Sequence, residues 1–184
     1  MIVIVSGPTA SGKTTLAKGL ATELNLSYLS GSSKLKELLK LRTLRTWESN
    51  EGIKAILFRL KNTEFDRKLD TEILKAIKRS DDMVVDSWTV PWLFKKGNAL
   101  KIYVKAPIEI RALRVSERNG IKYKAALSFT KKKDELTARI YKKLYGIDVL
   151  NDVSPFDLVV DSSKLDIDNL RDICVDFIFK FFKV

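Results

Sequence analysis

Histidine is absent from this chain of 184 residues, and cysteine occurs once, at Cys174. Without histidine, a Ser-His-Asp triad, a Cys-His pair and a histidine metal site are excluded, so a general base must be a carboxylate, a lysine or water. A single cysteine forms neither an internal disulfide nor a cysteine metal cage, and nothing in the sequence requires an oxidising compartment. We therefore expect a cytoplasmic protein.

Long apolar runs are missing as well. No run reaches the roughly 18 apolar residues of a membrane-spanning helix, so we expect no membrane partner. The apolar start at residues 2–5 lacks the basic flank and the length of a signal peptide, which favours a buried strand. Leu170, Cys174 and Ile178 recur at helical spacing near the other end. They predict a last helix that packs on a sheet rather than a membrane-surface anchor.

Positive charge exceeds negative charge. The chain has 34 Lys and Arg against 23 Asp and Glu, a formal net charge of +11. This excess favours binding to phosphates, whether on nucleotides, on nucleic acid or on an anionic surface. A lysine-rich chain with no glutamine, no histidine and one cysteine is also typical of heat-adapted proteins, so charge alone does not identify a partner.

Short apolar runs alternate with amphipathic stretches, and the chain length favours a single domain. Runs of this kind, separated by helices, are typical of a parallel sheet that is covered on both faces. The irregular basic stretches 42–62 and 119–133 are natural places for flaps that cover a substrate. Strands are expected at 2–5, 83–85, 100–104 and 158–160 and around Tyr28-Leu29; helices are expected after Gly12 and at 34–41, 53–61, 66–79, 108–118, 134–144 and 167–182.

Residues 7–14, Gly-Pro-Thr-Ala-Ser-Gly-Lys-Thr, match the phosphate-loop pattern G-x-x-x-x-G-K-[ST] between an expected strand and an expected helix. The glycines allow consecutive backbone N–H groups to surround phosphate oxygens, and the helix N-terminus adds positive charge. Lys13 is expected on the β- and γ-phosphates and Thr14 on Mg²⁺, so the loop predicts binding of ATP with Mg²⁺. The expected nucleotide-binding residues are Gly7, Pro8, Thr9, Ala10, Ser11, Gly12, Lys13, Thr14 and Thr15.

A second metal-binding candidate is Asp86, which ends the apolar run 83–85. At the carboxyl end of a strand beside the phosphate loop, a carboxylate can hold a water bound to Mg²⁺. An aspartate in a turn or at a helix N-cap is the alternative.

Four later segments, together with the phosphate loop, resemble the archaeal type of cytidylate kinase, within the adenylate-kinase-like nucleoside monophosphate kinases. The resemblance covers nearly the whole chain and implies a three-layer α/β P-loop kinase fold with a five-stranded parallel sheet. It also implies transfer of the γ-phosphoryl group of ATP to a pyrimidine monophosphate. The segments are 65–70, 105–111 with Arg114 and Arg118, 141–148 and 154–160. The single domain, 1–184, would comprise a core (1–30, 80–118 and 134–184), an acceptor-binding flap (31–79) and a short lid (119–133).

The resemblance also implies site residues. Ser30 and Ser32 fall where the family's Ser-x-Gly segment lines the acceptor site, and Asp66 and Arg67 fall in the acceptor helix. Lys36 falls where an arginine usually binds the acceptor phosphate. One lid arginine would cover the adenine and another would reach the transferred phosphoryl group. The expected catalytic residues are Lys13, Arg114, Arg118 and Arg139; the expected substrate-binding residues are Ser30, Ser32, Lys36, Asp66, Arg67 and Trp88.

Three departures from the family affect the acceptor and lid sites. Trp88 stands where an arginine on the acceptor phosphate is expected, and Lys36 lacks the planar fork of arginine. Ala138 and Ile140 stand at usual arginine positions of the lid, which leaves Lys133 and Arg139 as the nearby cations. One such arginine contributes about 10³-fold or more to phosphoryl transfer, so either the acceptor differs from that of the family or transfer is slow.

Three functions are therefore considered. The first is Mg²⁺-ATP-dependent phosphorylation of CMP or dCMP by a monomeric enzyme. The second is phosphorylation of a small hydroxylated or phosphorylated metabolite, with Trp88 and Trp92 as an aromatic wall. The third is an adenylate-kinase-related ATPase in RNA or ribonucleoprotein assembly, whose basic stretches 34–45 and 131–133 contact RNA.

Overall fold

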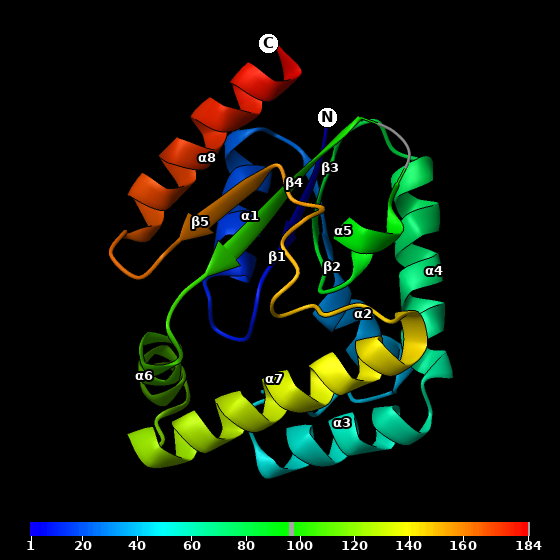
Figure 1. The fold of residues 1–184 in the computed structure, drawn as a ribbon, viewed down its shortest axis with the longest axis vertical. Helices are drawn as coiled ribbons and strands as arrows, with labels where there is room; N and C mark the ends of the chain where they lie inside the picture. Colours follow the sequence, from blue (N-terminus) through cyan, green and yellow to red (C-terminus); the bar gives the residue numbers. More distant parts are fainter. Residues whose placement is uncertain (96–97, 184) are drawn as a thin grey trace.

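Five parallel strands form one sheet in the computed structural model, which describes residues 1–95 and 98–183 (Figure 1). The prediction of a five-stranded parallel sheet is confirmed, including the short second strand around Tyr28-Leu29. The strands are β1 (Ile2–Ser6), β2 (Ser27–Ser30), β3 (Met83–Asp86), β4 (Ala99–Lys105) and β5 (Leu158–Asp161), in the spatial order β2-β3-β1-β4-β5.

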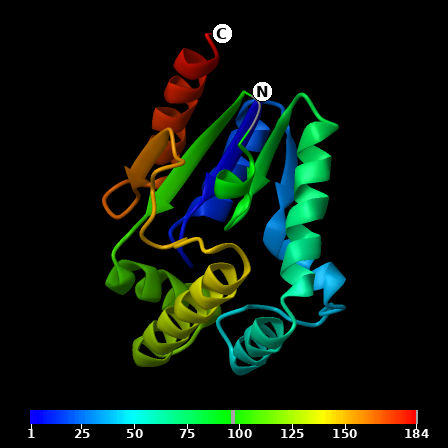
Figure 2. The same cartoon turned by 45° about the vertical axis from the view of Figure 1, so that its right-hand side comes forward.

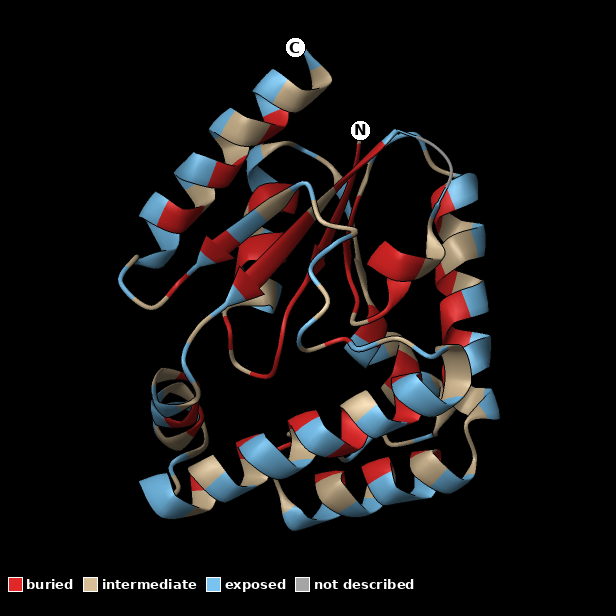
Figure 3. Cartoon of the chain, viewed as in Figure 1, coloured by how far each residue is buried: buried red, intermediate tan, exposed pale blue. Residues whose placement is uncertain are grey.

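The central strand, β1, is buried along its whole length, because helices cover both faces of the sheet (Figure 3). On one face lie α1 (Lys13–Glu23) and α8 (Ile167–Phe182); Leu170, Cys174 and Ile178 of α8 are buried, which confirms the expected packing. On the other face lie α2 (Gly31–Leu38), α4 (Glu64–Lys78) and the short α5 (Val90–Leu93).

Three helices lie beyond the carboxyl ends of the strands (Figure 1). They are α3 (Asn50–Lys61), α6 (Ile108–Asn119) and α7 (Tyr123–Tyr145). Figure 2 shows α7 and α3 side by side below the sheet, and α7 also packs against α6. A ligand at the carboxyl edge of the sheet therefore lies between the strands and this helical layer, the usual place for ligands in such sheets.

The expectation of irregular structure in the lid, 119–133, is wrong, because most of this stretch is helical. Gly120, with φ 63°, ends α6, and α7 begins three residues later instead of at residue 134. Ala126, Thr130 and Asp134 are buried four residues apart, so the apolar side of α7 continues through the lysine-rich run, whose Lys131 and Lys132 face solvent. The lysine-rich run is therefore part of a regular amphipathic helix, which the sequence analysis did not recognise.

Two other helices begin three residues earlier than expected, because serines cap them. The Ser30 hydroxyl accepts from the backbone N–H of Ser33, so α2 begins at Gly31, and Ser49 does the same for Gly52 in α3. Among the residues that the structure describes, no helix combines the length and the apolar character needed to cross a membrane.

Candidate active site

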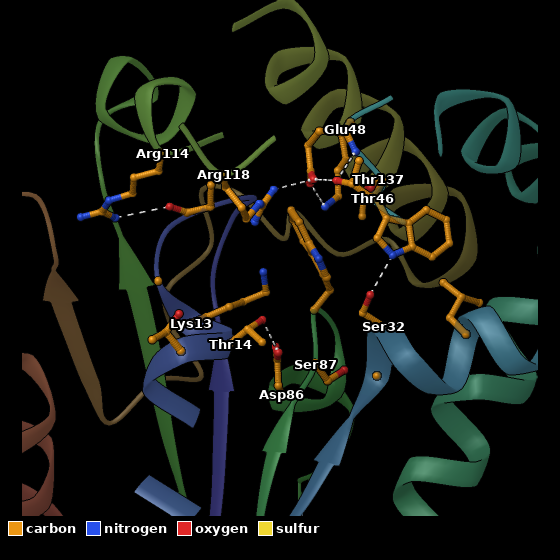
Figure 4. Close-up of a pocket in the computed structure, with 18 of the residues that line it drawn as sticks. Lys13, Thr14, Ser32, Thr46, Glu48, Asp86, Ser87, Arg114, Arg118 and Thr137 are labelled. Atoms are coloured by element: carbon orange, nitrogen blue, oxygen red, sulfur yellow. Dashed lines mark hydrogen bonds and ion pairs between the residues drawn. The ribbon is translucent and has the colours of Figure 1, made fainter. Parts of the chain in front are cut away.

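A cavity of about 980 Å³ opens at the carboxyl ends of the strands (Figure 4). The phosphate loop and the start of α1 form its floor, together with the end of β3. The segment after β5, with α6 and α8, lines one end, and α2, α3 and the segment before α3 line the other. One face of α7, with Lys133, Thr137 and Tyr141 at four-residue spacing, closes it opposite the loop. We call the end with Arg114 the donor end and the end with Ser32 the acceptor end, after the roles that the sequence predicts for these residues.

The two glycines of the phosphate loop have different roles. Gly7 has φ 151°, and a Cβ there would lie 2.1 Å from the carbonyl oxygen of Val104 in β4, so only glycine lets the loop pass this strand. Gly12 has φ 97° and starts α1 in the left-handed region. The loop conformation therefore depends on both positions.

A buried ion pair between α6 and α7 anchors the phosphate loop at Thr9. Asp134 of α7 accepts from the Thr9 backbone N–H at 3.0 Å and from Arg111 Nη1 at 2.6 Å. Arg111 in turn donates to the Thr9 carbonyl at 2.9 Å. The sequence analysis did not identify Arg111 or Asp134 as residues that hold the loop. The feature that could have indicated them is a charged residue on the buried side of an amphipathic helix. The hydroxyls of Thr9 and Ser11 are buried with no hydrogen-bond partner among the described residues, and neither residue lines the cavity.

Lys13 points into the cavity, and its ammonium lies 5.4 Å from the centre of the Trp88 ring (Figure 4). Burial lowers the pKa of this ammonium, although nearby Asp86 acts in the opposite direction. In the described part of the chain no carboxylate forms a salt bridge with it. A desolvated cation of this kind favours binding of an anion.

Thr14 and Asp86 meet at the carboxyl ends of β1 and β3, because these strands are neighbours in register. The Thr14 hydroxyl donates to Asp86 Oδ2 at 2.5 Å, and the Tyr28 hydroxyl lies 3.4 Å from the same oxygen. Asp86 caps no helix, since the N-cap of α5 is Thr89. A hydroxyl and a carboxylate fit Mg²⁺, which takes oxygen ligands and keeps several waters. The described residues contain no cluster of three or more His, Cys, Asp or Glu that could hold a metal by itself.

Arg114 fixes the donor end of the cavity. Its guanidinium donates to the Ser162 hydroxyl and carbonyl, at 3.0 and 2.7 Å, and to the Ala10 carbonyl at 3.3 Å. It therefore links the phosphate loop to the segment after β5. Arg118, one turn further along α6, lines the cavity with a half-exposed side chain.

Three of the predicted substrate-binding residues, Ser32, Lys36 and Trp88, line the cavity at the acceptor end. The Ser32 hydroxyl accepts from Trp47 Nε1 at 2.7 Å, and Lys36 Nζ donates to the Leu44 carbonyl at 2.8 Å. Burial lowers the pKa of Lys36. Ser30 lies next to this group but serves as the N-cap of α2 and is not among the lining residues.

Arg59 of α3 lines the acceptor end, and sequence reasoning missed it. Its side chain is buried, with Nη2 and Nε 2.5 and 3.2 Å from the two carboxylate oxygens of Asp66, and it lies 5.5 Å from the Trp47 ring. Nη1 has no hydrogen-bond partner among the described residues. The signal in the sequence was an arginine three residues after Ile56, on the apolar side of α3.

Besides Ser30, the residues that line the cavity do not include Gly7, Pro8, Thr9 and Ser11 of the phosphate loop, nor three further predicted site residues. Asp66 is fully buried behind Arg59, and its neighbour Arg67 is exposed on α4. Arg139 is exposed on the side of α7 away from the cavity, because residues 133, 137 and 141 take the inner side. Trp92 does not line the cavity either; its indole donates to Asp152 at 2.7 Å, and it packs edge-on against Phe156.

Glu48, just before α3, is a further residue that the sequence did not single out. It is almost completely buried and forms ion pairs with Lys133 of α7 and with Arg118 Nη2, the latter at 2.7 Å. Burial alone would raise the pKa of Glu48, but Lys133, a hydrogen bond from Thr46 and Arg118 lower it to about 2. These contacts join the acceptor side of the cavity to α6 and α7 (Figure 4).

Comparison with known proteins agrees with the resemblance seen in the sequence. The family model described as the cytidylate kinase-like family matches residues 2–164. The chain is 33% identical to a cytidylate kinase of Saccharolobus islandicus over 170 residues, covering 92% of this chain and 86% of that protein. It is 34% identical to a cytidylate kinase of Sulfurisphaera tokodaii over 173 residues, covering 94% and 92%.

Solved structures with the same fold are more distant in sequence. An uncharacterised protein from Eubacterium ventriosum has a TM-score of 0.71 at 21% identity, covering 97% of this chain and 98% of that one. Shikimate kinase from Aquifex aeolicus has a TM-score of 0.54 at 18% identity, covering 98% of both chains. At these identities the likeness concerns the fold, and it confirms the three-layer P-loop kinase architecture.

Proposed function

The chain belongs to the cytidylate kinase-like family, and from this premise we propose that it transfers the γ-phosphoryl group of Mg²⁺-ATP to CMP or dCMP. Membership makes the chain a kinase of the nucleoside monophosphate type. The observation that carries the proposal is one continuous cavity, with a complete phosphate loop at one end and a second cationic pocket at the other. Two phosphorylated substrates can therefore bind in it end to end.

In this proposal, ATP binds at the donor end of the cavity. The backbone N–H groups of the phosphate loop would contact its phosphates, and Arg114 would lie beside its base. Thr14 and Asp86 would hold Mg²⁺, which neutralises charge on the phosphates when it is bound. Lys13 would neutralise charge on the β- and γ-phosphates, consistent with a buried ammonium that lacks a carboxylate partner.

In this proposal, the acceptor binds in the pocket around Trp47. Lys36 supplies a partly buried cation, Arg59 supplies Nη1, which has no hydrogen-bond partner among the described residues, and Trp88 covers the side nearest Lys13. In the reaction, an oxygen of the acceptor 5′-phosphate forms a bond to the γ-phosphorus. The bond from that phosphorus to the bridging oxygen breaks, and ADP leaves with the electron pair. Enclosure of the cavity by α7 limits the access of water to the transferred group.

The kinase of a non-nucleotide metabolite receives less support from the geometry. Trp88 lines the cavity, but Trp92 is committed to Asp152 and Phe156, so the aromatic wall expected from both indoles does not form. The RNA-assembly alternative stays a prediction.

The proposal is tested by ADP release with ATP and Mg²⁺ in the presence of CMP, dCMP, UMP, AMP or GMP. We expect the highest kcat/KM with CMP or dCMP, and loss of turnover in Lys13→Met, whose uncharged side chain cannot neutralise the phosphates. Thermal unfolding of Lys13→Met, compared with the wild type, is the control that checks whether the variant is folded. Absence of turnover with every nucleoside monophosphate would contradict the proposal.

A further inference from the structure

We propose that Lys133, held in place by Glu48, is the catalytic cation that contacts the phosphoryl group while it passes from ATP to the acceptor. The inference rests on the proposed function and names a residue for its central step. In this chain Lys133 would replace the lid cations that Ala138, Arg139 and Ile140 do not supply.

The first support is the placement of the side chain. Lys133 lies on the cavity face of α7, opposite the phosphate loop, and its side chain is 13% exposed. Arg139 is exposed on the other side of the helix, as are Lys131 and Lys132. Among the cations of α7 from residue 131 to 139, Lys133 alone lines the cavity.

The second support is its position between two other lysines. Lys133 acts electrostatically on Lys13, which follows the phosphate loop, and on Lys36, which lies in the acceptor pocket. In both cases burial is the largest cause of the lowered pKa and the positive charge of Lys133 adds to it, although Glu48 acts in the opposite direction. Three ammonium groups that face one volume attract an anion that enters it. A phosphoryl group in transit, between a donor held near Lys13 and an acceptor held near Lys36, would be such an anion.

The third support is the donor capacity of the ammonium. A lysine has three N–H donors. Lys133 uses one on Glu48 Oε1 and makes no other hydrogen bond with the described residues. It can therefore contact phosphate oxygens without leaving Glu48. The carboxylate of Glu48, buried and paired on its other oxygen with Arg118, cannot move far, so it sets the position of the ammonium. Glu48 is a positioning residue in this arrangement.

The test compares Lys133→Met, Lys133→Arg and Glu48→Gln with the wild-type protein, and with Lys132→Met as the matched control on the exposed side of α7. Steady-state rates give kcat and both KM values with ATP and CMP. For Lys133→Met we expect kcat to fall about 10²-fold or more with each KM changed less than about threefold, because the contact is made in the transition state. Lys133→Arg should restore kcat to within about tenfold of the wild type, and Lys132→Met should leave it unchanged.

Glu48→Gln separates positioning from folding. We expect a smaller fall in kcat than in Lys133→Met, on the order of tenfold, with unchanged equilibrium binding of a non-hydrolysable ATP analogue. Lys133→Met leaves the Glu48 carboxylate with Arg118 as its one ion-pair partner among the described residues. The double variant Glu48→Gln/Lys133→Met removes both the buried carboxylate and the lysine, so it should fold normally and be as slow as Lys133→Met.

Two results overturn the inference in distinguishable ways. Suppose that the wild-type protein phosphorylates CMP and that the folded double variant has the kcat of the wild type, or loses activity through KM alone. The catalytic role proposed for Lys133 is then wrong, and the proposed function stands. If the wild-type protein turns over no nucleoside monophosphate, the proposed function and this inference are both wrong.

Discussion

Most of the charged residues that the fold buries form ion pairs around the cavity, whereas Asp70 and Asp86 accept hydrogen bonds from hydroxyls. Arg59 pairs with Asp66, Arg111 pairs with Asp134, and Glu48 pairs with two cations. An unpaired buried charge costs several kcal/mol, so each partner is required once the first is buried. These pairs place the guanidinium of Arg59 and the phosphate loop with little freedom to move.

Arg59 gives a prediction about acceptor binding. Arg59→Lys removes the planar fork and the free Nη1, while the ammonium can still pair with Asp66. We expect KM for CMP to rise about tenfold, equivalent to ~1.4 kcal/mol, with KM for ATP unchanged, because Arg59 lies at the acceptor end. Steady-state kinetics with each substrate varied in turn measure both values. Lys61→Met, an exposed change on the same helix, is the control, and equal KM for CMP in both variants would show that Arg59 does not contact the acceptor.

Asp70 gives a prediction about pH. It is buried in α4 and accepts hydrogen bonds from Thr89 Oγ1 at 2.6 Å and from the Tyr145 hydroxyl at 3.0 Å. Burial raises its pKa to about 7, although both hydrogen bonds act in the opposite direction. Between its unfolded pKa near 4 and about 7, the folded state binds the extra proton, so the free energy of unfolding decreases as pH rises through this window.

Asp70→Asn should remove this dependence. An asparagine can accept from Thr89 and donate to Tyr145, and it carries no charge. Between pH 5 and pH 8 we expect the wild-type protein to lose on the order of 2 kcal/mol of stability relative to the variant, measured by urea denaturation at both values. Asp81→Asn, at an exposed site, should follow the wild type. A constant difference between wild type and Asp70→Asn at the two pH values would contradict the assignment.

At the scale of elements, α3 and the segment before it build the acceptor end together. Gly52, in the first turn of α3, is buried against the backbone of Trp47, and a Cβ there would lie 2.2 Å from the Trp47 carbonyl oxygen. The Trp47 indole donates to Ser32 of α2, so this close approach fixes the distance between α2 and α3. The width of the acceptor pocket thus depends on one glycine.

Gly52→Ala should therefore disturb acceptor binding although the residue does not line the cavity. The methyl group would push the Trp47 segment outward and weaken its hydrogen bond to Ser32. We expect KM for CMP to rise about tenfold and the free energy of unfolding to fall by about 1–3 kcal/mol, the usual range for overpacking. Lys54→Ala, on the exposed side of the same turn, is the matched control. If both variants bind CMP equally well, Gly52 does not control the pocket.

At the scale of the whole molecule, the two faces of the sheet have different tasks. The buried residues on the face covered by α1 and α8 form one apolar cluster, and the opposite face carries the helices around the acceptor end of the cavity. Ile178 of α8 lies eight residues, about 12 Å, beyond Leu170, which is part of the cavity lining. Stability and activity can therefore be separated by substitutions in α8.

Ile178→Ala and Ile173→Ala test this separation. Ile178 is fully buried and Ile173 is 48% exposed on the same helix. We expect Ile178→Ala to lower the free energy of unfolding by about 2–4 kcal/mol because it leaves a cavity, and Ile173→Ala to lower it by less than about 1 kcal/mol. In both variants kcat at 25 °C should equal that of the wild type. A loss of kcat in Ile178→Ala under conditions where it remains folded would mean that α8 is coupled to the active site.

The sequence by itself determined the features that depend on local chemistry. The phosphate loop needs glycine, lysine and threonine at fixed spacing. The short β-branched runs between amphipathic stretches predict a buried parallel sheet, but they do not predict the order of its strands. The same spacing located α8 within its observed bounds. The family followed from segments that are specific residue by residue, and it is confirmed. The RNA partner, the monomeric state and the cytoplasmic location stay predictions.

Only the tertiary structure decided which charges face the cavity. Arg59 and Glu48 do not stand out in the sequence, and Lys133 does so only as one of two lid cations. The places of all three arise because α3, the segment before it and α7 meet above the carboxyl ends of the strands. Arg139 carries the charge expected of a lid residue, yet the helical period turns it away from the cavity and turns Lys133 inward. A residue's type depends on the sequence alone, but the side of a helix that becomes buried depends on what packs against it, and this is set by contacts between residues far apart in the chain.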